Sequence, residues 1–174
     1  MCAVHRPLAA LVAAGIIFLA MLATAPSASA AEVVAFNGDS APGTIVVRTK
    51  ERRLYFVLGQ GRALRYTVGV GRASRQWAGT SFIDGKHIRP DWEPPEAVRH
   101  DRPNLPQIVP GGSPANPMGV AALTLSGGAY AIHGTNAPKS IGGFVSYGCI
   151  RMFNQDITDL YARVAVGTRV VVTR

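Results

Sequence analysis

Residues 146–152 read SYGCIRM, and this stretch suggests a β-strand that presents a reactive thiol. Side chains alternate between the two faces of a strand, so Ile150 is expected on the core side and Cys149 and Arg151 on the opposite side. The glycine at position 148 allows another backbone to approach closely. Its amide and that of Cys149 can face a single acceptor, which predicts an oxyanion hole.

A histidine lies upstream of this thiol in a second short strand. Residues 129–134 read AYAIHG, an apolar run that ends in His133 and a glycine, and a Gly/Asn/Pro/Ser-rich loop then leads to Cys149. A thiol of ordinary pKa, about 8.5, needs a base or a nearby positive charge to react at neutral pH. Either residue alone is more often structural, but together they predict Cys149 as nucleophile and His133 as general base.

Three motifs resemble a known family. AIHGTN at 131–136, SIG at 140–142 and SYGCIRM at 146–152 are similar to the signature of YkuD-type L,D-transpeptidases of bacterial cell walls. The similarity extends from about Thr44 to the C-terminus. It implies a mostly β domain, a curved sandwich or partly closed barrel with one or two short helices. It also implies peptidoglycan stem peptides as partners and no metal or organic cofactor.

The resemblance further implies a reaction. Cys149 would attack the carbonyl of the third, diamino-acid residue of a tetrapeptide stem and release the terminal D-Ala. An amine on a second stem would then resolve the thioester as a 3-3 cross-link. Oxyanion or substrate-binding roles are expected for Gly134, Thr135, Ser146, Tyr147, Gly148 and Arg151.

Several of these positions have a second interpretation. Arg151 binds a stem carboxylate or stabilises the thiolate, or else forms a structural ion pair. Ser146 is expected to brace its loop, with substrate contact as the lesser role, and Thr135 either orients the imidazole or only shapes a turn. Asn154 is expected to cap a following helix.

Position 147 departs from the family pattern. Many members carry histidine where this chain has Tyr147. A phenol titrates near pH 10 and cannot act as a base at neutral pH. His133 is therefore expected to be the only base, and the role of position 147 is left open.

The N-terminus resembles a secretory signal peptide. Residues 1–30 combine a short basic start, a long apolar run and the small-residue motif ASA, with an uncleaved anchor as the alternative. Residues 31–43 are predicted to be a linker and residues 44–174 the catalytic domain. Removal of Cys2 with the signal would leave Cys149 as a lone thiol in an exported protein of the periplasm or cell envelope.

Composition limits the possible partners. The chain has a formal net charge of +8, and loss of Arg6 with the signal would leave +7 on 144 residues, enough for one domain with a core. The arginines are scattered rather than clustered with aromatic side chains, which argues against nucleic acid and suits an acidic wall. We expect a monomer without a membrane span once the signal is removed.

The remaining pattern is mainly β. Strands are predicted at 44–49, 53–58, 63–70, 79–83, 120–125, 130–133 and 168–173, and a helix after residue 154. Residues 97–117 contain five prolines, which predicts a long loop without a helix.

Several other functions are weighed as alternatives. A sortase-like transpeptidase also orders His, Cys and Arg, but its arginine lies several residues beyond the cysteine rather than two. An NlpC-type peptidase places its cysteine before its histidine. A non-catalytic wall-binding module is a different class, and an L,D-carboxypeptidase or a protein-anchoring enzyme would use the same chemistry with another acceptor.

Overall fold

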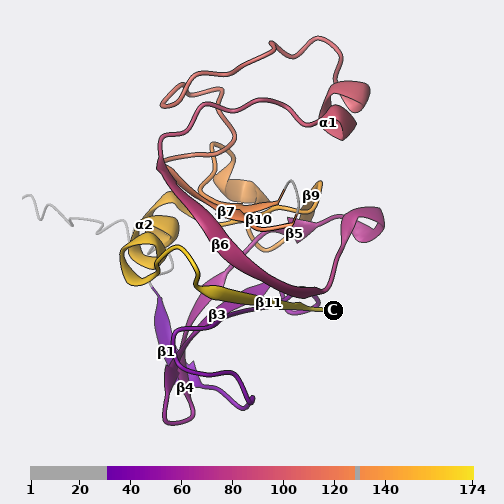
Figure 1. Cartoon of the computed structure of the whole chain (residues 1–174). Coiled ribbons are helices and arrows are strands. Elements are labelled where there is room, and N and C mark those ends of the chain that lie inside the picture. Colours follow the sequence, from indigo (N-terminus) through magenta and orange to yellow (C-terminus); the bar gives the residue numbers. More distant parts are fainter. Residues whose placement is uncertain (1–30, 128–129) are drawn as a thin grey trace, which may run out of the picture.

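The computed structural model describes residues 31–127 and 130–174, and β-strands dominate it (Figure 1). The expected signal peptide, with Cys2, lies outside these residues. Among the helices of the described residues, none combines the length and the apolar character needed to cross a membrane.

Eleven strands and two α-helices make up the described fold. The strands are β1 (Glu32–Ala35), β2 (Ile45–Arg48), β3 (Arg53–Gly59), β4 (Arg62–Thr67), β5 (Val70–Gly71), β6 (Gly79–Ile88), β7 (Ala121–Leu125), β8 (Ala131–His133), β9 (Phe144–Ser146), β10 (Ile150–Arg151) and β11 (Arg169–Thr173). The helices are α1 (Glu96–Asp101) and α2 (Asn154–Arg163), with short 3-10 turns at Ala73–Arg75 and Pro138–Ser140.

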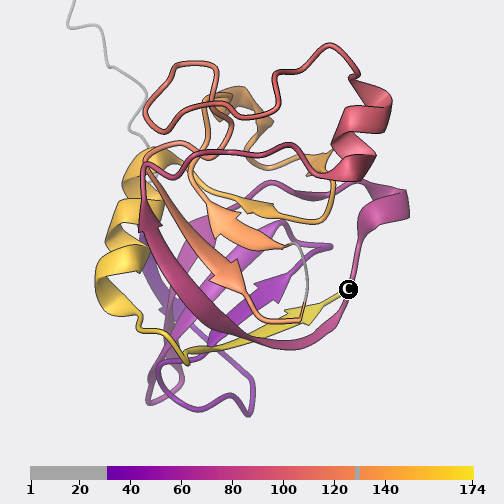
Figure 2. The same ribbon diagram turned by 45° about the horizontal axis from the view of Figure 1, so that its top comes forward.

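Strand β6 joins the two halves of a curved nine-stranded sheet. The order is β1-β4-β3-β2-β11-β6-β7-β8-β10, and it does not close on itself. The first part of β6 pairs with β11 and its second part pairs with β7, with a register shift inside the β6–β7 pairing between Ile83 and Gly85. The sheet therefore bends through β6, as the long curved ribbon in Figures 1 and 2 shows. This architecture confirms the predicted mostly β, partly closed fold.

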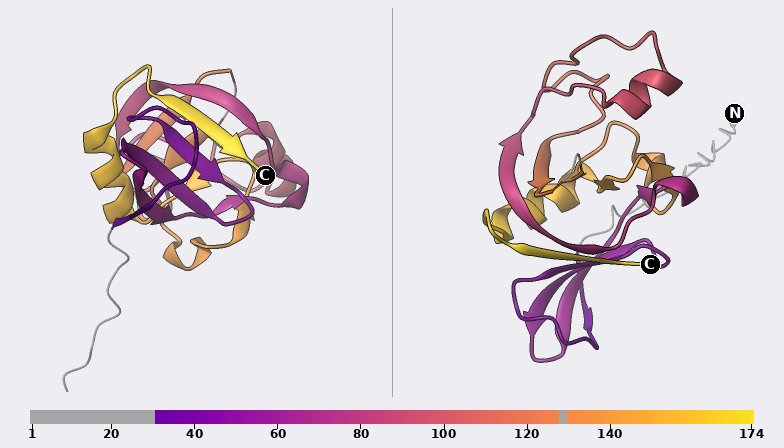
Figure 3. Two further views of the ribbon diagram at one scale, coloured as in Figure 1. Left: turned by 90° about the horizontal axis from the view of Figure 1, so that it is seen from below. Right: turned by 45° about the vertical axis from the view of Figure 1, so that its right-hand side comes forward.

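The main core lies between the two halves of the bent sheet. It combines buried side chains from both halves with the apolar face of α2, where Ile157 and Leu160 are fully buried. This spacing of three residues is the helical periodicity that predicted α2. Because α2 also contacts β7 and β8, it supports the strands that lead into the candidate site (Figure 3).

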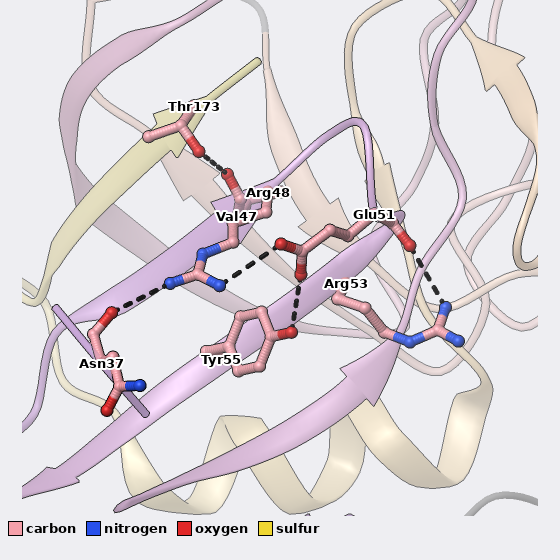
Figure 4. Close-up of polar contacts among 7 residues, drawn as sticks. All are labelled: Asn37, Val47, Arg48, Glu51, Arg53, Tyr55 and Thr173. Atoms are coloured by element: carbon pink, nitrogen blue, oxygen red, sulfur yellow. Dashed lines mark hydrogen bonds and ion pairs between the residues drawn. The ribbon is translucent and has the colours of Figure 1, made fainter. Parts of the chain in front are cut away.

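A second, smaller cluster covers the other face of the N-terminal strands. Phe36 and Tyr55 pack with their ring centroids 5.4 Å apart, and the Arg48 guanidinium lies 5.0 Å from the Tyr55 ring centroid. Figure 4 shows Arg48 donating to the Asn37 carbonyl and to Glu51, while the Tyr55 hydroxyl donates to Glu51. These contacts hold the β2–β3 hairpin against the segment that follows β1.

Two segments differ from the sequence predictions. The expected linker, residues 31–43, contains β1, which pairs with β4, and the buried Phe36. The expected helix-free loop contains α1, so that prediction was wrong. Prolines flank this helix at position 95 and position 103 rather than interrupting it, and proline is well tolerated at a helix start.

Candidate active site

Strands β8 and β10 bring the predicted histidine and cysteine onto one face of the sheet. They pair in parallel with Ile150 opposite Ile132 and Arg151 opposite His133. Both isoleucines are buried in the main core. The alternation predicted for this stretch is therefore confirmed, and His133, Cys149 and Arg151 line one cavity on the other face.

The imidazole of His133 is buried and oriented by backbone. Its Nδ1 lies 2.6 Å from the carbonyl oxygen of Gly134. A carbonyl can only accept, so Nδ1 donates, and in the neutral ring Nε2 carries no proton and is the basic nitrogen. Burial, and after it the charge of Arg151, lower the pKa of His133 to about 4. Hydrogen bonds to the Gly134 and Pro117 carbonyls act in the opposite direction and raise the pKa. The ring is thus neutral at pH 7.

Cys149 is partly buried, and its thiol is not activated by its surroundings alone. Burial raises the pKa of Cys149, while the backbone amide of Ala131 and the charge of Arg151 act in the opposite direction. The thiol is therefore protonated at neutral pH. A neutral imidazole on the same face is the group that can accept this proton.

Asn154 holds the turn that orients His133. Its Oδ1 accepts from the Thr135 amide at 2.9 Å and from the Val120 amide at 3.4 Å. A methyl group on Gly134 would collide with the same oxygen. The expected helix cap is therefore wrong, because α2 begins after Phe153 without a side-chain cap. Asn154 instead ties the first turn of α2 to the histidine loop.

Thr135 shapes the turn after the histidine. Its side chain is buried, and its Oγ1 accepts from the Ala137 amide at 3.0 Å. None of the hydrogen bonds found in the described chain joins Thr135 to the imidazole. Of its two expected roles, the structure supports turn formation.

Ser146 braces the cysteine loop. Its hydroxyl donates to the Cys149 carbonyl at 2.6 Å and accepts from the Gly148 amide at 3.1 Å. This geometry agrees with the bracing role predicted for Ser146. The Gly148 amide, however, does not point at an open acceptor site as expected, and a substrate oxygen would have to replace the serine hydroxyl there.

Gly148 has a conformation and a packing environment that exclude other residues. Its φ is +128°, a region that L residues rarely adopt, and a methyl group here would overlap the Tyr130 ring. Tyr130 stacks on Trp77 with centroids 5.0 Å apart, and the Trp77 indole donates to the Gly148 carbonyl at 3.0 Å. No local sequence pattern predicts this support, because Trp77 lies 71 residues before Gly148.

Tyr147 contacts the segment between β6 and β7, residues 89–120, which we term the capping segment. The Tyr147 hydroxyl donates to Asp101 at 2.6 Å, and Arg72 donates to the same carboxylate at 2.9 Å. The Arg72 guanidinium also lies 4.1 Å from the Tyr147 ring centroid. Hydrogen bonds from Tyr147 and then Arg72 hold the pKa of Asp101 well below its usual range. Tyr147 is thus a tether to α1.

A cavity of about 420 Å³ lies between the capping segment and the strands that carry the cysteine. The capping segment forms the upper part of the molecule in Figure 2. It contributes aromatic, aliphatic and basic side chains to the cavity wall, and no Asp or Glu lines the cavity within the described residues. The lining from this segment includes Trp92, Pro95, Val98, Arg102 and Leu105.

Arg151 is the basic group on the cysteine side of this cavity. Its Nε is buried without a hydrogen-bond partner in the described structure. None of the ion pairs formed between described residues includes Arg151. Of its expected roles, the structural ion pair is therefore not observed.

Comparison with protein families gives a match over most of the chain. The model of the family named YkuD, described as the L,D-transpeptidase catalytic domain, matches residues 42–172. A protein of Escherichia coli strain K12 named "Probable L,D-transpeptidase ErfK/SrfK" is 41% identical over 147 residues, which cover 76% of this chain and 44% of that protein. "Probable L,D-transpeptidase YbiS" of the same strain is 39% identical over 147 residues, 76% of this chain and 45% of that protein. The chain thus spans less than half the length of these relatives.

Solved structures show a similar fold at low sequence identity. An L,D-transpeptidase from Mycobacterium smegmatis superposes with a TM-score of 0.61 at 16% identity, over 75% of this chain and 58% of that chain. The catalytic domain of an L,D-transpeptidase from E. faecium superposes with a TM-score of 0.59 at 17% identity, over 78% of this chain and 100% of that chain. These similarities support the fold described above.

Proposed function

The chain belongs to the YkuD family of L,D-transpeptidase catalytic domains, and from this premise we propose that it transfers peptidoglycan stem peptides through an acyl-enzyme on Cys149. The donor is a tetrapeptide stem, and the leaving group is its terminal D-Ala. The acceptor is an amine on a second stem, which gives a 3-3 cross-link. Outside the cytoplasm, where the predicted signal peptide would direct the chain, such stems are accessible.

One observation supports this proposal above all others. His133 ends β8, Cys149 directly precedes the parallel strand β10, and both side chains line the same cavity. The thiol keeps its proton at neutral pH, and the imidazole is neutral. A nucleophile and a base with these protonation states are what acyl transfer to a thiol requires.

The proposed reaction proceeds in two steps. His133 Nε2 takes the thiol proton while Cys149 Sγ attacks the carbonyl carbon of the third residue, and the C–N bond to D-Ala breaks with the proton delivered to its amine. The acceptor amine then attacks the thioester, loses a proton to His133, and Sγ leaves and regains a proton. Gly134 acts through its carbonyl, which orients the imidazole.

The other predicted site residues have supporting roles in this proposal. Ser146 and Gly148 hold the shape of the cysteine loop. Thr135 maintains the turn after the histidine, and Tyr147 holds α1 against the site. Arg151 is the cationic group beside the thiol.

Product analysis tests the proposed function. The purified protein is incubated with a disaccharide-tetrapeptide, and the products are separated and weighed by mass spectrometry. We expect free D-Ala together with a dimer of the mass of a 3-3 cross-link. Release of D-Ala without a cross-linked dimer would indicate that water or another acceptor resolves the same acyl-enzyme. Unchanged tetrapeptide would contradict the proposal and favour a binding module.

Asn154 provides a test of how the histidine is oriented. Asn154→Ala removes the acceptor for the Thr135 amide, so we expect kcat to fall about tenfold because the His133 turn loosens, in line with the loss of one buried hydrogen bond. Asn154→Asp keeps an acceptor oxygen at the same place and is the matched control. It should retain most of the wild-type kcat. Equal losses in the two variants, measured with KM and the melting temperature, would show that Asn154 does not act through this hydrogen bond.

A further inference from the structure

Arg151 is a partly buried cationic side chain that forms no ion pair with the described residues. It lies beside Cys149 in the cavity wall, its Nε is buried, and that nitrogen has no hydrogen-bond partner in the described structure. A buried donor nitrogen of a charged group is costly to leave without a partner, unless a ligand supplies the acceptor. The lining contributed by the described residues contains no acidic side chain. The missing counter-charge is therefore expected to come from the molecule that fills the cavity.

A second guanidinium reaches the same cavity from the capping segment. Arg102 follows the last residue of α1 and lines the cavity together with Arg151. Burial is the main cause that lowers the pKa of Arg151, the charge of Cys149 raises it, and the charge of Arg102 lowers it. Two like charges held near one space favour an anion between them.

Tyr147 and Asp101 explain how Arg102 is kept in place. Asp101 ends α1 and is bound by the Tyr147 hydroxyl and by Arg72. Arg102 is the next residue, and its backbone amide donates to the Val98 and Arg99 carbonyls. Because Tyr147 belongs to the cysteine loop, this tether links the position of Arg102 to that of the nucleophile.

We propose that Arg102 and Arg151 form a carboxylate-binding site beside Cys149, and that the Tyr147 contact to Asp101 positions Arg102 for it. This inference rests on the proposed function, and it names the chemistry that selects the donor. Guanidinium groups bind carboxylates through paired, charge-assisted hydrogen bonds.

A tetrapeptide stem offers this carboxylate from two sources. One is the C-terminal carboxylate of the leaving D-Ala, and the other is the side-chain carboxylate of a third residue such as diaminopimelate. The first lies on the Cα that follows the scissile amide nitrogen, and the second ends the side chain of the residue that carries the attacked carbonyl. The shared chemistry is a carboxylate on one of the two residues joined by the scissile bond, and substrates with one of the two amidated distinguish the sources.

Binding measurements on the full chain carrying Cys149→Ala test the site without turnover. Calorimetry gives Kd for three peptides: the tetrapeptide, its C-terminal carboxamide, and the form amidated on the third side chain. We expect one of the two amides to bind about ten- to a hundredfold more weakly than the tetrapeptide, the range of a charge-assisted contact. The amide that loses affinity identifies the carboxylate.

Added substitutions show which side chains recognise it. In the same background, Arg102→Gln should bring the affinity for the tetrapeptide close to that for the weaker-binding amide, so that the ratio of the two affinities (the acid-to-amide ratio) falls toward one. Tyr147→Phe should reduce this ratio less. Arg62→Gln, which removes one charge from the distant β3–β4 hairpin, is the matched control and should leave the ratio unchanged. Arg102 is exposed, so its replacement is expected to leave the fold intact.

Two results would overturn the carboxylate site: equal affinities for all three peptides, or an unchanged ratio in Arg102→Gln. Absence of binding by every peptide would overturn it as well. These outcomes are separate from the proposed function, which product analysis with the wild-type chain decides. If the wild-type protein formed 3-3 cross-linked peptide dimers but showed no preference for the acid over the amides, the proposed function would stand and the carboxylate site would be rejected.

Discussion

Cys149→Ala is expected to abolish release of D-Ala from a disaccharide-tetrapeptide, with a loss of at least about 10⁴-fold in kcat, because no other thiol lies in the mature chain as predicted. The side chain is small and only partly buried, so the melting temperature should change by a few degrees at most. Rates are measured by quantifying D-Ala, and the fold is checked by circular dichroism.

Cys149→Ser is the control for this prediction. It keeps a hydroxyl where the thiol was, but a hydroxyl has a much higher pKa than a thiol and is a poor nucleophile beside a neutral imidazole. We expect nearly the same loss as for alanine, with wall binding retained. If Cys149→Ala released D-Ala at the wild-type rate, the nucleophile would have to lie elsewhere, and a change in neither activity nor binding would fit a binding module.

His133→Asn is expected to lower the acylation rate by about 10²- to 10⁴-fold, the usual contribution of a general base. Asparagine is chosen because its amide nitrogen can replace Nδ1 as the donor to the Gly134 carbonyl. The orientation of the turn is then preserved while the basic nitrogen is removed. Stopped-flow measurement of acylation, with the melting temperature as a check of folding, gives the result.

The pH dependence separates loss of the base from loss of structure. In the wild type, the pKa of His133 is about 4, so the base is available above this value and activity should fall as the pH drops through it. In His133→Asn only the thiolate reacts, and the pKa of Cys149 is raised. Its rate should therefore rise about tenfold per pH unit through pH 8. Parallel profiles for the two proteins would contradict the role of His133 as base.

The placement of Cys149 and His133 at one cavity could be predicted from the sequence, because local rules determine the face on which each side chain lies. A strand alternates its side chains, so an apolar residue at 150 places its neighbours at 149 and 151 on the other face. The run that ends in His133 is equally short and apolar. The sequence alone does not determine whether the two strands are neighbours, and in the structure β8 and β10 do pair.

The supporting contacts could not be predicted, because they join residues that are distant in sequence. Asp101 lies 46 residues before Tyr147, and no periodicity links them. Asn154 has the sequence features of a helix cap, and only the packing of α2 against the histidine loop directs its side chain to the Thr135 amide. Likewise, the Gly148 amide is occupied by a serine hydroxyl from the same loop.

The tyrosine at position 147 is understood through these distant contacts. Its side chain offers no imidazole that could act as a second base. Its hydroxyl instead donates to Asp101, while its ring receives the Arg72 guanidinium. The departure from the family pattern thus connects the cysteine loop to the capping segment. In the proposed mechanism, His133 is therefore the only base.

The most direct test of the central proposal is the mass of the protein during turnover. The wild-type chain is mixed with a disaccharide-tetrapeptide, quenched in acid, weighed intact and then digested for peptide mapping. We predict an added disaccharide-tripeptide acyl group, on the peptide that contains Cys149, together with one equivalent of D-Ala. Release of D-Ala with an unmodified Cys149, or an acyl group on another residue, would contradict the proposed mechanism.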